Sequence, residues 1–175
     1  MIRARLIEIG RYTLLVLLAV FLQAVFASQL PLLGVRADIF VITVVLVAVG
    51  AGSNTGLIFG FIAGLTADVV FLEPVGTRAF MYLLAGYGVG RYVEEFGLAS
   101  AWVVVILAAA ASLGSQGVYG VMQIAMGAEG SLFSMVRRQM IPSALFDGLL
   151  AAPLYLGLVR LKLVHQPRSA GPLFS

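Results

Sequence analysis

Few side chains in this sequence could carry out catalysis. The one histidine is His165, and cysteine is absent, so no Ser–His–Asp triad, paired-histidine metal site or thiolate site can be assembled. The stretch "GYGVGR" looks at first sight like a phosphate-binding loop, but it lies within an apolar run, has no preceding strand and lacks the lysine. We therefore expect no enzymatic activity, no cofactor and no metal.

Charged residues stand out where they interrupt apolar runs. A carboxylate at such a position normally faces protein and finds a partner. We expect Asp68 to pair with Arg78 across the short turn "EPVG", the alternative being a lone aspartate that reaches water at a helix end. Asp147 has the same two interpretations, with Arg137 or Arg138 as its partner. A proton or cation relay through both carboxylates would need a connected polar path, which the sequence does not show.

A stripe of polar residues follows one broad face of the apolar run over residues 98–126. Steps of three and four residues place its members together on a helix. They could hydrogen-bond to neighbouring helices, which we favour, or line a small-molecule cavity. The stripe consists of Ser112, Ser115, Gln116, Tyr119 and Gln123.

Glycines form a second helical pattern. Gly56, Gly60 and Gly64 fall four residues apart, and Asp68 takes the next place. Gly86 and Gly90 repeat the spacing in the following apolar run. Small residues at this spacing let membrane helices approach closely. We expect a groove that packs these two runs as a tight hairpin; the competing interpretation is that the groove receives a partner's helix.

Composition identifies the environment. Hydrophobic residues make up 61% of the chain and charged residues 11%, with a mean hydropathy of +1.06, whereas soluble domains carry about 25% charged residues. The sequence predicts an all-α polytopic membrane protein. Its net charge of +3 comes from basic residues near the ends of apolar runs, which suits contact with membrane lipid and gives no support for nucleic-acid binding.

Six transmembrane helices are expected in a single domain, residues 1–165, followed by a polar tail, 166–175. The predicted spans are about 12–30, 37–50, 55–72, 79–92, 98–126 and 141–164. A crossing needs about 20 residues. The second and fourth spans are shorter, so they need a locally thinner bilayer or neighbouring helices that shield their ends. Five spans are the alternative count. A cleavable signal peptide ending near Val25-Phe26-Ala27 is a competing interpretation of the first span.

Orientation follows from the basic residues, which favour the cytoplasmic side. Cytoplasmic N- and C-termini place seven of them inside and four outside, with Arg137 and Arg138 against the trend. The inside set is Arg3, Arg5, Arg11, Arg91, Arg160, Lys162 and Arg168, and the outside set adds Arg36 and Arg78. This topology puts Asp68 and Asp147 in the outer half of the bilayer.

Residues 36–91 resemble the rod shape-determining protein MreD family. The resemblance rests on a charged entry to an apolar span, a G-x-x-x-G-F-x-x-G-L-x-x-D helix, P-x-G, and a glycine-rich helix. It falls on Asp38, Gly56, Gly60, Phe61, Gly64, Leu65, Asp68, Pro74, Gly76, Gly86 and Gly90. Two departures are Ala37, where the family often has proline, and a "GSNTG" turn without basic residues.

The resemblance implies a bacterial inner-membrane component of the cell-elongation machinery, which binds MreC and works with RodA, its penicillin-binding transpeptidase partner and the MreB filaments. It also implies a six-helix fold similar to the substrate-binding subunits of energy-coupling-factor transporters, and no catalytic residue. Two functions follow as hypotheses: a non-catalytic scaffold that supports lateral peptidoglycan synthesis by helix packing, or a small-molecule-binding or transport subunit.

Overall fold

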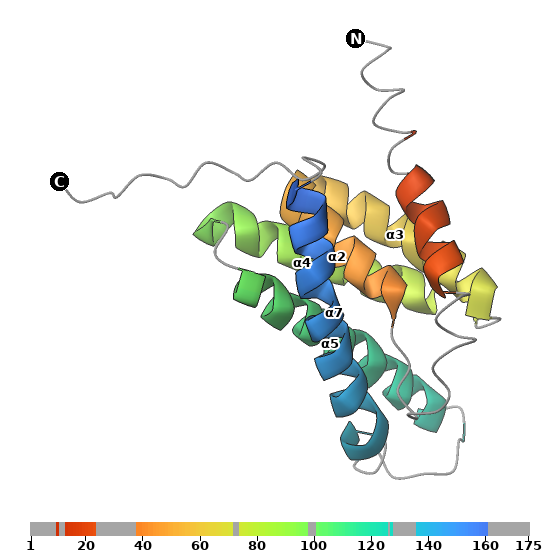
Figure 1. The fold of residues 1–175 in the computed structure, drawn as a ribbon. Coiled ribbons are helices and arrows are strands. Elements are labelled where there is room, and N and C mark those ends of the chain that lie inside the picture. Colours follow the sequence, from red (N-terminus) through yellow and green to blue (C-terminus); the bar gives the residue numbers. More distant parts are fainter. Residues whose placement is uncertain are drawn as a thin grey trace.

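The computed structural model describes residues 10, 13–23, 38–71, 74–97, 101–125, 127 and 136–160. All regular structure in these ranges is helical, as the sequence predicts (Figure 1). A first apolar helix, Thr13–Gln23, precedes α2 (Ile39–Ala51), α3 (Ser53–Phe71), α4 (Thr77–Phe96) and α5 (Ala101–Ala125). A π-helical turn, Val136–Met140, then leads into α7 (Ile141–Arg160).

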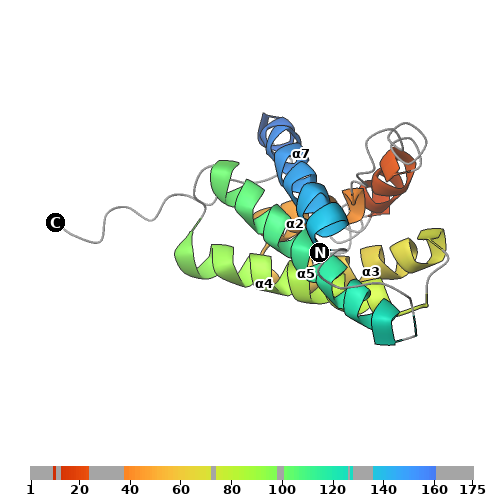
Figure 2. The ribbon, with the colours of Figure 1, turned by 90° about the horizontal axis from the view of Figure 1, so that it is seen from below.

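The centre of the fold is α2. It is apolar on every side, ten of its 13 residues are buried, and its Thr43 hydroxyl donates to the Ile39 carbonyl 2.7 Å away. Figure 2 shows α3 and α4 on one side of α2, with α7 and the Thr13–Gln23 helix on the other. Thirteen residues span only about 20 Å, less than the hydrocarbon thickness of about 30 Å. Its neighbours shield α2, so it need not reach both membrane surfaces.

Two helices are long and apolar enough to cross a membrane, within the ranges that the structure describes. They are the segments Ser53–Val70 of α3 and Ala101–Met122 of α5. Shorter apolar helices are Thr13–Gln23, Ile39–Ala51 and Ile141–Gly157. The predicted span 79–92 lies inside the longer α4, which extends past its apolar part into charged residues at both ends. The six-span count stays a prediction.

The most extensive helix–helix contact among the described residues joins α3 and α4, which form an antiparallel hairpin. A Cβ atom added at Gly56 would lie 2.5 Å from the carbonyl oxygen of Gly86, and one at Gly60 would overlap the carbonyl group of Tyr82. Gly64 lies in the same way against the backbone of Ala79. The glycine groove therefore holds the backbone of α4, which leaves no room in it for the helix of another protein.

A second antiparallel pair consists of α5 and α7. Gly148 of α7 brings the two backbones together, because a Cβ there would lie 2.9 Å from the carbonyl oxygen of Val105. This pair meets the rest of the bundle through smaller contacts of α5 with α4 and α2, and of α7 with α2. The outer side of α5 is exposed along most of its length.

Replacing Gly60 with alanine should destabilise the hairpin, because the new methyl group would overlap the Tyr82 carbonyl. Overpacking of this kind costs about 1–3 kcal/mol. The matched control is Gly88→Ala on α4, where nothing lies within 4 Å of the added Cβ. Thermal unfolding of the purified proteins in detergent would measure both; equal melting temperatures for the two variants would contradict the close approach.

Candidate functional site

The first turn of α2 is the meeting point of a polar cluster. Helix starts leave N–H groups without intrahelical acceptors, and here three acceptors from three elements serve them. Asp38 caps its own helix by accepting from the Val41 N–H (3.2 Å), and Gln23 accepts from the Ile39 N–H (2.9 Å). The carboxylate of Asp147, from α7, accepts from the Asp38 N–H (2.9 Å). The start of α2 is thus tied to the first helix and to α7.

The second carboxylate oxygen of Asp38 connects α2 to α4. It accepts from the guanidinium of Arg78 at 3.0 Å, which makes a salt bridge, and from the hydroxyl of Tyr82. Tyr82 is fully buried, and its hydroxyl also receives a hydrogen bond from Arg78 at 3.2 Å. A charge-assisted pair with a second donor is stronger than a neutral hydrogen bond, so this contact fixes α2 against α4.

Asp68, the predicted partner of Arg78, caps the start of α4. Its carboxylate accepts from the backbone N–H groups of Gly76 (2.7 Å), Arg78 (2.9 Å) and Ala79 (3.4 Å). The two residues therefore meet, but through the Arg78 amide, while the guanidinium forms its salt bridge with Asp38. Asp68 has no exposed surface, and the positive end of the α4 dipole stabilises its charge.

The opposite end of the hairpin repeats this arrangement with the roles exchanged. Glu94, late in α4, accepts from the Ser53 N–H at 2.7 Å and from the Ser53 hydroxyl at 3.0 and 2.8 Å. Each helix of the pair thus caps the start of the other. Our reading of the sequence missed Glu94, although the glycine spacing could have indicated it: Gly90 lies against Ser53, and Glu94 follows one turn later.

The polar stripe of α5 turns in part toward α7. The Ser112 hydroxyl donates to Asp147 at 2.5 Å, and the Gln116 amide nitrogen donates to the Ser112 oxygen at 2.8 Å. Ser115 instead bonds to the backbone of its own helix, at the Ala111 carbonyl. The side chains of Tyr119 and Gln123 lie outside the described residues. Of the described members of the stripe, Ser112 thus forms the predicted bond between helices, whereas Ser115 and Gln116 bond within α5.

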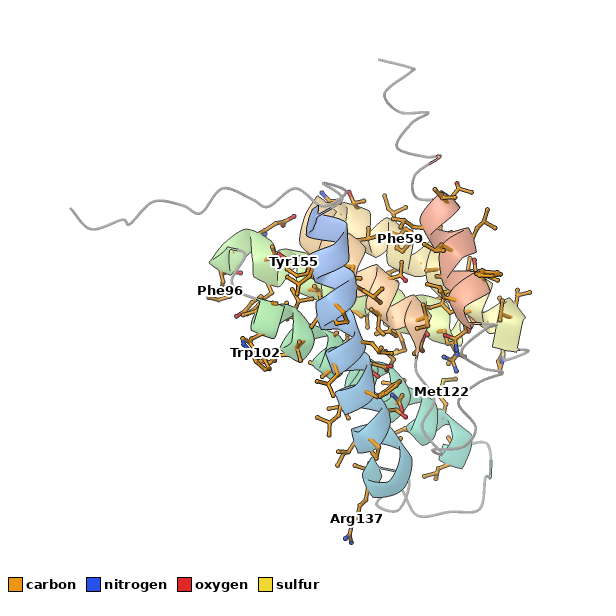
Figure 3. All side chains as sticks on the ribbon, viewed as in Figure 1. Phe59, Phe96, Trp102, Met122, Arg137 and Tyr155 are labelled. Carbon is orange, nitrogen blue, oxygen red and sulfur yellow. The ribbon has the colours of Figure 1, made fainter. Side chains whose placement is uncertain are left out.

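The partner of Asp147 differs from the arginines that the sequence suggested. Arg137 is exposed and points away from the bundle (Figure 3), and the side chain of Arg138 is not among those described. Asp147 has no exposed surface, and its bonds run to Ser112 and to the amide of Asp38. A connected polar path thus exists after all, from α5 through α7 to the start of α2. The sequence could not show it because it joins residues 109 positions apart.

The described part of the chain is all-helical, its carboxylates cap helices, and two of its helices are long and apolar enough to cross a membrane; these features fit the class of helical membrane proteins. The model of the family described as rod shape-determining protein MreD matches residues 5–163, so the chain belongs to that family. Searches of the curated proteins and of the solved structures found no match. The resemblance seen in residues 36–91 is confirmed, and membership implies a role in determining rod shape.

Replacing Asp68 with alanine should loosen the start of α4, since three backbone N–H groups would lose their acceptor. Loss of a charged cap of this kind costs about 2 kcal/mol. The control is Glu95→Ala, which removes an exposed carboxylate from the same helix. Amide hydrogen exchange at Gly76, Arg78 and Ala79 should accelerate only in the Asp68 variant; unchanged exchange would show that the cap is not needed.

Proposed function

We propose that the protein is a non-catalytic component of the bacterial cell-elongation complex, which supports lateral peptidoglycan synthesis by binding other membrane proteins. The observation that carries this proposal is the family match over nearly the whole chain. The main proposed partner is MreC. RodA and its penicillin-binding transpeptidase partner are further proposed partners, and contact with MreB filaments would be indirect. Supporting this role, the described acidic residues of the interior act as helix caps and in ion pairing, which are structural tasks.

The partner's helix needs a surface other than the glycine groove, which α4 fills. The outer side of α5 fits best. Added Cβ atoms at Gly114 and Gly117 would meet nothing within 4 Å, and exposed Val118 and Val121 continue the same apolar face. Membrane helices associate where small residues permit close packing. The proposal therefore assigns the single membrane helix of MreC to this face.

Replacing Gly114 and Gly117 together with leucine should weaken the complex with MreC without disturbing the fold, because both positions face outward. A loss of about 1.4 kcal/mol lowers the affinity tenfold, which co-purification from native membranes would detect. Rod-shaped cells relying on the variant should become round. Gly88→Leu is the control, an equally open glycine on α4. If MreC still co-purifies in full with the double variant, this face is not the binding surface.

The proposed location is the bacterial cytoplasmic membrane, crossed several times, with both termini in the cytoplasm. Aromatic side chains gather where α4 ends and α5 begins: the Tyr92 and Phe96 rings lie 4.9 Å apart, and Trp102 is 72% exposed. Figure 3 shows Phe96 and Trp102 on the same side of the bundle. Tyrosine and tryptophan are enriched at both membrane–water interfaces, so this junction fits a membrane surface, which is the inner one in the proposed topology.

Single cysteines should report this orientation directly, because the chain has none of its own. In the proposed topology Val75, which is 73% exposed in the turn between α3 and α4, faces the outside. A cysteine at Val75 should react with a membrane-impermeant maleimide on intact spheroplasts. A cysteine at Glu95, at the other end of α4, should react only after permeabilisation. The reverse pattern would invert the topology.

A further inference from the structure

The first turn of α7 contains a buried hydroxyl group that the hydrogen bonds above do not use. Ser143 of α7 is 1% exposed, and its oxygen has no hydrogen-bond partner. It lies one helical turn before Asp147, on the same buried face of α7. Leaving a polar group in this state costs free energy, and such groups are rare in folded proteins. The unpartnered Ser143 hydroxyl therefore points to a bound ligand beside Asp147.

The register of the two helices shows which side chains surround that position. Ser112 bonds to Asp147, and Gly148 packs against Val105 and Ala109, so the helices run antiparallel. From this register we infer that Gln116, one turn further along α5, comes opposite Ser143, one turn back along α7. The Gln116 amide nitrogen donates to Ser112, which leaves the oxygen of the same amide as an acceptor. One carboxylate and three neutral oxygen-bearing side chains thus line this seam.

The charges around the seam do not balance. Among the described residues, the guanidinium of Arg78 on α4 forms its salt bridge with Asp38, and the group of α5 that bonds to Asp147 is the neutral hydroxyl of Ser112. The carboxylate of Asp38, whose own amide bonds to Asp147, is negative as well. The first helix contributes the neutral Gln23. The start of α2 offsets about half an elementary charge through its dipole. Among the residues that the structure describes, the partners of the buried Asp147 carboxylate are neutral, and a low-dielectric interior strongly disfavours a buried charge without an opposite partner.

We propose that this seam binds one small monovalent cation, sodium or a proton, on the carboxylate of Asp147, with Ser112, Gln116 and Ser143 as the neutral oxygen donors. A single carboxylate matches a single positive charge, and oxygen donors suit hard cations. Bound there, the cation neutralises Asp147 and gives the Ser143 oxygen a partner. It also tightens the junction between α7, α5 and the start of α2. This site is independent of where MreC binds.

The experiment measures thermal unfolding of the full chain, purified in detergent, in sodium chloride and in choline chloride at equal ionic strength, between pH 5 and 9. If sodium is the occupant, the melting temperature rises with the logarithm of sodium concentration above its dissociation constant. If a proton is the occupant, sodium has no specific effect. Stability then rises as the pH falls, because the folded state holds a proton that the unfolded state releases.

The Asp147→Asn variant should lose whichever response the parent protein shows. Its amide keeps an acceptor for the Asp38 N–H and can donate to Ser112, so the surrounding bonds survive. Glu95→Gln, which neutralises an exposed carboxylate, should respond like the parent. Ser143→Ala should shift the midpoint of the response at least threefold in cation concentration, and it serves as the test should Asp147→Asn fail to fold. A parent protein that responds equally to sodium and choline, and follows the same pH profile as Asp147→Asn and Ser143→Ala, would overturn the proposal.

Discussion

The start of α2 lies inside the protein, and every N–H group there must find an acceptor among the protein's own atoms. In a membrane no water substitutes for a missing partner. This constraint explains why polar side chains from three other elements converge on the first turn of α2, around Asp38. It also explains why the fold tolerates buried carboxylates: they are the acceptors that let short helices begin within the bundle. Their chemical task is structural before it is anything else.

The same rule shapes the α3–α4 hairpin. Two antiparallel helices present the start of each beside the end of the other, so an acid near the end of either can cap its neighbour. Asp68 and Glu94 do this at the two ends. Capping across helices requires backbones close enough for a short side chain to reach, and the glycines supply that closeness. The glycines and the two acids therefore act on the same contact: the glycines bring the helices together, and the acids cap their ends.

Much of the fold could be predicted from the sequence. Hydropathy predicted the helical class, and glycine spacing predicted that α3 and α4 pack together, because both are local properties of a helix. The partners of the charged residues could not be predicted. A short turn joins Asp68 and Arg78, which suggested an ion pair between their side chains. The turn instead brings the backbone N–H of Arg78 to Asp68, while the Arg78 guanidinium reaches Asp38. Asp147 meets Asp38 only through tertiary packing, which a single sequence does not reveal.

The bond between Asp147 and the Asp38 amide has a consequence for how the protein is made. The earlier residue emerges from the ribosome long before the later one, which lies 109 positions downstream. Until α7 has been inserted, the start of α2 lacks one of its acceptors, and the central helix is incompletely satisfied. A helix synthesised long after α2 thus completes the first turn of the central helix. A chain interrupted before α7 would leave the Asp38 N–H without this acceptor at the centre of the fold.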